Sequence, residues 1–282
     1  MKKLALSSLI AVFAVSGAHA ANVIDGNPLY MPKANHFYSV TDVATHTEGV
    51  TPWGMQEDFG YGITDKLAVQ VSTTLWENDS FDTFAWDNMS LSATFRALDM
   101  KGWKADLVAA YTAGADEIVG GGLYYHQKSL RPADDNFWFD KDLIGYRWTA
   151  GIRGGYVSPE FTIAGHIAYE YFNGESFNWG DYGEHSLKLG IDGQFVVDSN
   201  WNLVAGAEYT GITNDKVATY TDVKSGIDVK DAGVWTGYFG VNYNIDATKF
   251  VGAYVNGRMA HATGDWEMDD GFGFGFKFGV DF

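Results

Sequence analysis

The stretch Gly271-Phe-Gly-Phe-Gly-Phe-Lys-Phe-Gly-Val-Asp-Phe282 decides the fold of this chain. Its apolar side chains stand at every second position, and the residues between them are glycine, lysine or aspartate. Period two places the aromatic rings on one face of a β-strand, whereas an amphipathic helix would space its apolar residues three and four apart. The stretch therefore predicts a strand with one continuously apolar face and one small or polar face.

Segments with the same period recur along the chain, and together with the final one they predict twelve strands. The expected strands cover 36–44, 53–63, 66–76, 88–98, 103–113, 143–157, 160–172, 184–197, 201–212, 233–245, 249–261 and 271–282. Tight connections rich in turn-forming residues alternate with longer ones. The longer connections include 77–87, 114–142, 173–183, 213–232 and 262–270. Residues 120–127 are an alternative further strand, which we leave in the loop 114–142.

The final strand resembles the closing strand of bacterial outer-membrane β-barrels, and the hairpin 59–72 resembles a first periplasmic hairpin of porin-like barrels. The resemblance implies that Phe278, Val280 and Phe282 are the signal read by the barrel-insertion machinery, a partner during biogenesis. Short turns at one end and long loops at the other are typical of these barrels. We therefore predict an all-β fold, a transmembrane antiparallel up-and-down barrel of about twelve strands over 36–282. The rival architecture is a soluble periplasmic β-sandwich or small β-propeller.

The first twenty residues have the three parts of a secretory signal peptide. Lys2 and Lys3 precede an apolar stretch over 4–15, and Ala18-His-Ala20 fits a cleavage site. The apolar stretch is shorter than the roughly 20 residues that a membrane-spanning helix needs. We expect 1–20 to be cleaved, 21–35 to form an irregular periplasmic lead-in, and the mature protein to reside in the bacterial outer membrane, in contact with its lipid.

Composition agrees with this interpretation and disfavours polyanionic partners. Aromatic residues make up 16% of the chain and glycines number 34, as many strands and aromatic girdles require. The absence of cysteine rules out disulfide staples. The formal charge of −17 becomes −19 once the two signal lysines are removed, and such acidity disfavours nucleic acid as a partner.

Charged residues that alternate with the apolar ones must face the lumen, because a lysine or arginine on the lipid face costs about 2–4 kcal/mol at the membrane midplane. The residues predicted to line a pore are Arg96, Asp106, Arg147, Arg153, His166, Glu170, Lys188, Asp192, Glu208, Asn242, Asn256, Arg258 and Lys277. Both signs are present, so a strongly single-sign pore is not expected, although acidic loops such as Asp134-Asp135 would favour cations at the mouth. Many inward positions are glycine or alanine, and we expect them to leave open space.

Two segments fit this alternation poorly. The segment 36–44 has no clean apolar face. In the segment 53–63, Glu57 falls on the outward face together with Phe59 and Tyr61.

We predict passive diffusion of small hydrophilic solutes or ions through a narrow, charge-lined lumen, since twelve strands lie between filled barrels of about eight and open channels of about sixteen. The alternative is a closed-lumen barrel with a structural or surface-interaction role. Some twelve-stranded outer-membrane barrels degrade lipid, but His185 and Ser186 are adjacent in a strand and point to opposite faces, and His126 with Ser129 lacks a supporting motif. We therefore expect no enzyme, and an outer-membrane lipid hydrolase is the less favoured alternative.

We also expect no metal and no cofactor. The acidic run 265–270 offers oxygen ligands for a hard cation such as calcium, but it lacks the glycine spacing of a helix–loop–helix calcium site. A solvated acidic loop is the simpler interpretation of this run.

Overall fold

The computed structural model describes residues 27–46, 53–78, 83–115, 144–176, 180–213, 233–261 and 271–282. These residues form one closed barrel of twelve strands. The strands are β1 (Phe37–His46), β2 (Trp53–Thr64), β3 (Leu67–Asn78), β4 (Thr83–Met100), β5 (Trp103–Ala115), β6 (Ile144–Val157), β7 (Phe161–Ser176), β8 (Gly180–Val196), β9 (Trp201–Ile212), β10 (Gly233–Asn244), β11 (Lys249–His261) and β12 (Gly271–Asp281). In this part of the chain no helix is long and apolar enough to span a membrane.

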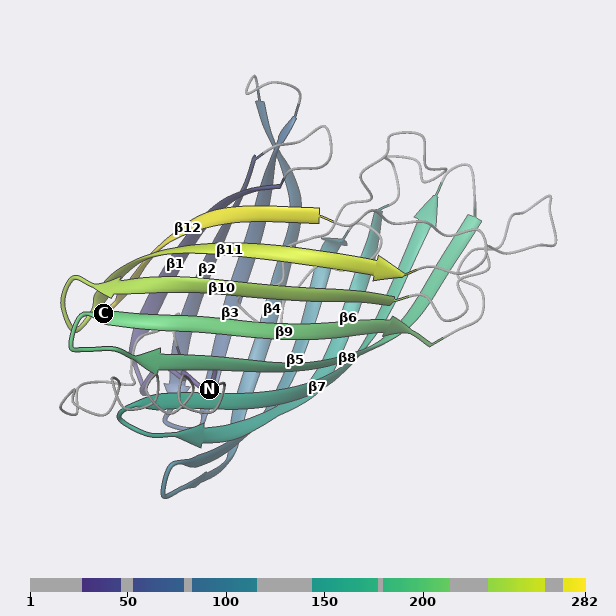
Figure 1. Cartoon of the computed structure of the whole chain (residues 1–282). Coiled ribbons are helices and arrows are strands. Elements are labelled where there is room, and N and C mark those ends of the chain that lie inside the picture. Colours follow the sequence, from purple (N-terminus) through teal and green to yellow (C-terminus); the bar gives the residue numbers. More distant parts are fainter. Residues whose placement is uncertain are drawn as a thin grey trace, which may run out of the picture.

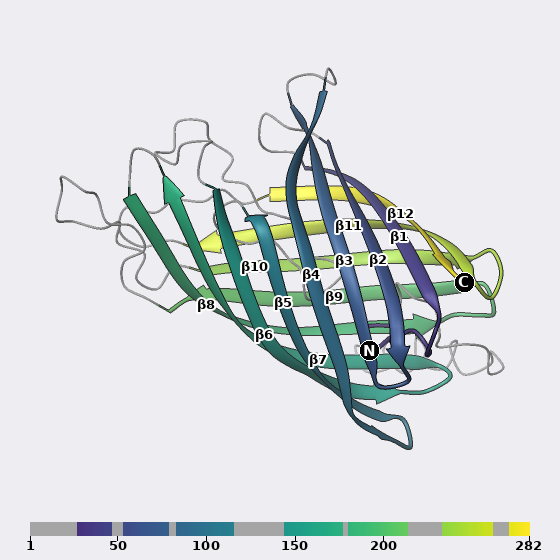
Figure 2. The same cartoon turned by 180° about the vertical axis from the view of Figure 1, so that it is seen from behind.

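Each strand pairs antiparallel with its sequence neighbours, and β1 closes the barrel against β12. The closing seam runs from Tyr38 opposite Asp281 to His46 opposite Gly273, and the backbones of Phe37 and Phe282 exchange hydrogen bonds just below it. The strands of the front and back walls cross in projection, as tilted strands of a barrel do (Figure 1; Figure 2). The predicted fold class is therefore confirmed, and the sandwich and propeller alternatives are excluded.

The strand bounds agree closely with the predicted segments, and the main differences are extensions. β4 begins five residues earlier than expected, β8 begins four residues earlier, and β7 ends four residues later. Five described connections are short, and the one at Lys101-Gly102 has positive φ at both residues, as a two-residue type I′ hairpin turn requires. The alternative strand 120–127 lies outside the described residues, as does the predicted signal peptide.

Side chains alternate between the two faces of the wall, except at register shifts such as the one between Arg96 and Leu98. In β12 the outward rings of Phe272, Phe274, Phe276 and Phe278 are exposed, whereas Lys277 between them is buried inside. Aromatic contacts mark the two borders of the outward apolar band. The periplasmic girdle contains Phe37, Tyr61, Trp103, Tyr156, Trp201 and Tyr243, and the extracellular girdle contains Tyr111, Tyr146, Trp148, Tyr169, Tyr209 and Trp235. An exposed apolar band between such girdles is the lipid-facing surface of an outer-membrane barrel.

The first strand has a clear inward face that the sequence pattern did not reveal. Tyr38, Val40, Asp42 and Ala44 point inward and are buried. The pattern was obscured because the inward residues are partly apolar and the outward residues Ser39 and Thr41 are polar.

Candidate functional site in the barrel lumen

The structure places every residue predicted to line a pore on the inward face of its strand. Asn256 and Arg258 are half-buried, and the others are buried. Within the described part of the barrel these side chains therefore contact other protein groups far more than solvent. The contacts fall into three groups: one at the periplasmic end, one in the middle of the lumen, and one along the closing seam.

The periplasmic group is built on Asp106, whose side chain has no exposed surface. Arg96 donates from Nε to one carboxylate oxygen at 2.5 Å and from Nη2 to the other at 3.2 Å. Arg153 donates from Nε to that second oxygen at 2.9 Å. A register shift in β4 between Arg96 and Leu98 lies beside this group, where such irregularities commonly re-aim a side chain. Arg96 also lies 3.8 Å from Asp99, which Lys104 contacts at 2.8 Å, so three cations share two carboxylates and the group carries an excess positive charge.

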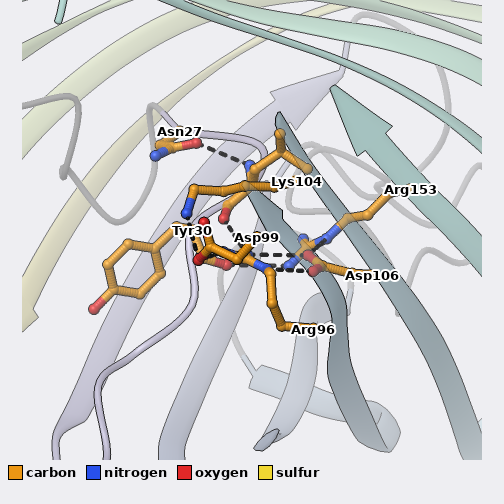
Figure 3. Close-up of polar contacts among 8 residues, drawn as sticks. Asn27, Tyr30, Arg96, Asp99, Lys104, Asp106 and Arg153 are labelled. Carbon is orange, nitrogen blue, oxygen red and sulfur yellow. Dashed lines mark hydrogen bonds and ion pairs between the residues drawn. The ribbon is translucent and has the colours of Figure 1, made fainter. Parts of the chain in front are cut away.

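This excess charge binds the backbone of the segment that precedes β1. Arg96 Nη2 donates to the carbonyl oxygen of Leu29 at 2.7 Å, and Arg153 Nη2 donates to that of Tyr30 at 3.1 Å (Figure 3). The Leu29 side chain is 1% exposed, and Asn27 accepts a hydrogen bond from its backbone N–H at 2.9 Å. These contacts hold residues 27–32 against the inner wall of the barrel, whereas a periplasmic lead-in would lie outside it. We call residues 27–32 the lumen segment.

The Tyr30 side chain joins the lumen segment to the closing seam. Its hydroxyl donates to Asp281 Oδ2 at 3.0 Å, and its ring stands edge-on to Tyr38 with centroids 5.7 Å apart. It also packs against the buried cluster of Tyr38, Val40 and Phe250. Burial, and next the Asp281 carboxylate, raise the pKa of the Tyr30 hydroxyl well above its ordinary value. The hydroxyl therefore remains a hydrogen-bond donor throughout the neutral and mildly alkaline range.

A second group of charges fills the middle of the lumen. Lys188, which is completely buried, lies 3.1 Å from a Glu170 oxygen and 3.9 Å from a Glu208 oxygen. The two ring nitrogens of His166 lie 3.1 Å from Asp192 and 2.9 Å from Glu208. Strands β7, β8 and β9 thus carry one continuous ionic network. Pairing of this kind offsets part of the cost of burying charges in a barrel interior.

The third group lies inside the closing seam. Tyr254 donates its hydroxyl to both oxygens of Asp42, at 2.8 and 3.0 Å. Lys277 lies 3.9 Å from Asp42 and stands over the Tyr254 ring, with its nitrogen 5.0 Å from the centroid. This group connects β1, β11 and β12 from within.

The prediction that inward glycines leave open space is wrong at several positions. A side chain at Gly275 would collide with the Tyr254 ring, and one at Gly206 would collide with Tyr238. The glycines instead accommodate rings that lie flat along the wall from the neighbouring strand. The lumen is consequently fuller than a count of small inward residues suggests.

A cavity lies between the lumen segment and the wall. Its volume is about 30 Å³, which suits one or a few water molecules but no organic solute. The lining is mostly polar and comprises Tyr30, Met31, Pro32, Tyr38, Gln56, Asp58, Ala68, Val69, Gln70, Ser92, Thr94, Val108 and Arg153. The lumen segment therefore fills part of the periplasmic half of the barrel beside the inner wall.

The histidines that were weighed as catalysts have other contacts. His185 Nδ1 bonds the Tyr169 hydroxyl on the outer face, while Ser186 is buried on the inner face, as their adjacency in a strand predicted. His166, on the inner wall, contacts the carboxylates of Asp192 and Glu208. His126 and Ser129 lie outside the described residues.

Sequence reasoning missed two contributors to the lumen. Residues 21–35 were predicted as an irregular periplasmic lead-in, and the position of 27–32 inside the barrel was not predicted because this part of the chain has no strand period. Asp42 was missed because the first strand showed no clean face. Its alternation with Val40 and Ala44 was the available signal.

Comparison with known proteins supports the architecture and goes no further. No family model matches the chain, and no curated protein matches its sequence. The NanC porin is similar in structure, with a TM-score of 0.58 and 6% identity over 86% of this chain and 98% of that one. An outer membrane channel from Pseudomonas putida F1 is similar with a TM-score of 0.57 and 12% identity, over 93% of this chain and all of that one. The chain therefore has the fold of the twelve-stranded bacterial outer-membrane β-barrels, and its exposed apolar band places it in that membrane.

Proposed function

We propose that the protein is a porin-like channel for passive diffusion of ions and small hydrophilic solutes, narrowed at its periplasmic end by its own lumen segment. The observation that carries the proposal is the inner wall. Ionisable side chains of both signs stand on it from Arg96 at the periplasmic end to Arg258 near the extracellular end. Fixed charges of both signs line permeation paths and set their selectivity.

The way in which the lumen segment is held also supports conduction. The lumen segment contacts the wall through hydrogen bonds and packing. The groups of the lumen segment that accept hydrogen bonds from the wall arginines are backbone carbonyls. Such contacts can be exchanged for water without breaking the barrel ladder, which is closed independently by β1 and β12. The segment can then act as a removable constriction. The names of the two similar structures, a porin and a channel, agree with this role.

A second candidate function is a closed barrel with a structural or surface role. The burial of Lys188, Asp106 and Glu170 favours it, because fully paired charges fill a lumen as well as they line one. Catalysis is not part of either proposal.

The test is single-channel recording of the refolded protein in planar bilayers, with the reversal potential measured under a salt gradient. We expect small discrete conductance steps. Arg258→Ala removes an inward positive charge and should shift the reversal potential toward cation selectivity. Met259→Ala is the matched control, since Met259 is the next residue of β11, points outward and is 64% exposed.

Repeated insertion without conductance would contradict the channel and support the closed barrel. Conductance with an identical reversal potential for wild type and Arg258→Ala would show that ions bypass the inner wall described above.

A further inference from the structure

Asp58 is a buried carboxylate that forms no ion pair with the described residues of the barrel. It stands on the inner face of β2 and is 3% exposed. Every other buried carboxylate of the described inner wall lies within 3.9 Å of a lysine, arginine or histidine nitrogen. Buried charges in proteins are paired or bound to a metal ion, because an isolated charge away from water is very costly.

The groups that contact Asp58 are neutral hydrogen-bond donors. Gln56 Nε2 donates to its two oxygens at 3.0 and 3.2 Å, and the Ser72 hydroxyl donates to it from the facing position of β3. A relay stands behind Ser72, since Tyr38 donates to Gln70 Oε1 at 2.6 Å and Gln70 Nε2 donates to Ser72 Oγ at 2.9 Å. All these donors are directed toward Asp58, which suits an ionised carboxylate that only accepts hydrogen bonds.

The charged groups in the neighbourhood do not serve as its partner. Lys277 and Asp42 act on Asp58 from longer range, but they lie 3.9 Å apart and their opposite charges largely cancel. Arg153 is engaged by Asp106 and by the backbone of the lumen segment. The partner that remains for Asp58 is a positive ion from solution.

The cavity beside Asp58 has the size and the ligands for such an ion. Its volume is about 30 Å³, which is room for a small ion together with a water molecule. The oxygen-bearing side chains that line it are those of Gln56, Asp58, Gln70, Ser92 and Thr94. Oxygen ligands suit hard cations, and one carboxylate among neutral oxygens balances a single positive charge.

We infer that this cavity binds a monovalent hard cation such as sodium, and that the ion fastens the lumen segment to the wall. Tyr30, Met31 and Pro32 of the lumen segment line the same cavity, so the site is complete only while the segment lies against the wall. An ion that binds this state alone shifts the equilibrium toward it. The site goes beyond the proposed channel function, because a closed barrel could hold the ion equally well.

Isothermal titration calorimetry of the refolded protein in detergent tests the site directly. Sodium chloride replaces choline chloride at constant ionic strength, so that screening does not change. The wild type should bind a single sodium ion, and Asp58→Asn, which removes the charge at nearly constant volume, should abolish binding. Glu57→Gln is the matched control and should bind sodium as the wild type does. It removes a carboxylate from the next position of β2, where Ser39 and Thr41 contact it on the outer face.

Thiol labelling of Leu29→Cys measures how often the lumen segment leaves the wall. Position 29 is 1% exposed and does not line the cavity. Sodium at about ten times its dissociation constant should slow labelling about tenfold, as binding to one state alone predicts. With Asp58→Asn, labelling should not depend on sodium. Ser92→Ala removes one neutral oxygen, so it should keep the effect but need more sodium, and it tests the site even if Asp58→Asn does not fold.

Folding of each variant is checked by heat-modifiable electrophoretic mobility. A wild type that responds to sodium no more than to choline would overturn the inference, since water or a proton would then suffice in the cavity. Equal sodium effects in the wild type and Asp58→Asn would place the ion elsewhere and overturn it too. Sodium binding without slower labelling would contradict the fastening of the lumen segment. None of these measurements needs conductance, so a barrel that is silent in planar bilayers contradicts the channel and not the cation site.

Discussion

Arg153 binds the backbone carbonyl of Tyr30 from 3.1 Å while its Nε atom remains on Asp106. Arg153 thereby holds the lumen segment to the barrel wall together with Arg96, which binds the carbonyl of Leu29. Replacing Arg153 by leucine removes a charged hydrogen bond, a contact worth about 1.5–3 kcal/mol, and leaves Asp106 paired with Arg96. We expect the lumen segment to be released more often and the mean conductance in planar bilayers to rise.

Lys104→Leu is the matched control for Arg153→Leu. Lys104 is also basic and lies at the same end of the barrel, but it pairs with the half-exposed Asp99 at 2.8 Å. Its loss should leave conductance unchanged. Two results together would contradict the role given to Arg153. The conductance of Arg153→Leu would equal that of the wild type, and a cysteine at position 31 (Met31→Cys) would react with thiol reagents equally slowly with and without Arg153→Leu.

Alkaline pH should loosen the lumen segment through Tyr30. Its pKa is raised by burial and by Asp281, so the folded state favours the protonated hydroxyl. The stabilisation is fully present below the ordinary tyrosine pKa of about 10 and is lost as the pH rises beyond it. Methanethiosulfonate labelling of Met31→Cys should therefore accelerate above pH 10. The Tyr30→Phe variant lacks the titrating group, so its labelling should accelerate less above pH 10. If labelling accelerated equally with tyrosine and with phenylalanine at position 30, Tyr30 would be ruled out as the cause.

Lys188→Met should destabilise the barrel strongly. The substitution leaves Glu170 and Glu208 in a buried site without their shared cation, and removing one partner of a buried pair costs about 3–5 kcal/mol. Equilibrium unfolding by urea in detergent or lipid measures the loss. Lys249→Met is the control, because Lys249 is 48% exposed and its 3.4 Å contact with Asp246 lies in solvent, where an ion pair contributes little to stability. Equal losses in the two variants would show that the central network contributes nothing of its own.

Gly275→Ala should cost about 1–3 kcal/mol of unfolding free energy, because its methyl group would collide with the Tyr254 ring. Displacing that ring also breaks its hydrogen bonds to Asp42. Gly237→Ala is the matched variant, since its nearest neighbouring atom would be 3.5 Å away, and the gain in strand preference makes it neutral or slightly stabilising. If Gly275→Ala were as stable as Gly237→Ala, the ring would have to have a second position of equal energy.

The strands could be predicted from the sequence because lipid enforces a strict pattern on them. Each outward position must be apolar and each charge must turn inward, so the alternation at Phe272–Phe278 or Phe161–Tyr171 is visible in one dimension. The same rule placed Lys188 and Glu208 on the inner wall. It could not show which charges meet, because the pairing of His166 with Glu208 depends on register across three strands.

The lumen segment could not be predicted in this way. Its position depends on hydrogen bonds from Arg96 and Arg153 to backbone carbonyls, and carbonyls are common to all residues. Nor could the role of Gly275 be found, since an inward glycine can equally leave a gap or accommodate a ring. Glu57, by contrast, was correctly placed on the outward face, and its apparent misfit proved to be a property of the molecule.

Because of the position of Tyr30, the lumen segment can bind inside the barrel only when β1 and β12 are paired in their native register. The Tyr30 ring rests on Tyr38, Val40 and Phe250, and its hydroxyl bonds Asp281, so it needs β1 and β12 in their native alignment. A slip of β1 by one residue would turn Tyr38 and Val40 to the lipid side and remove the surface on which the ring packs. A barrel closed in the wrong register therefore cannot bind its lumen segment, and the bound segment stabilises the native register alone.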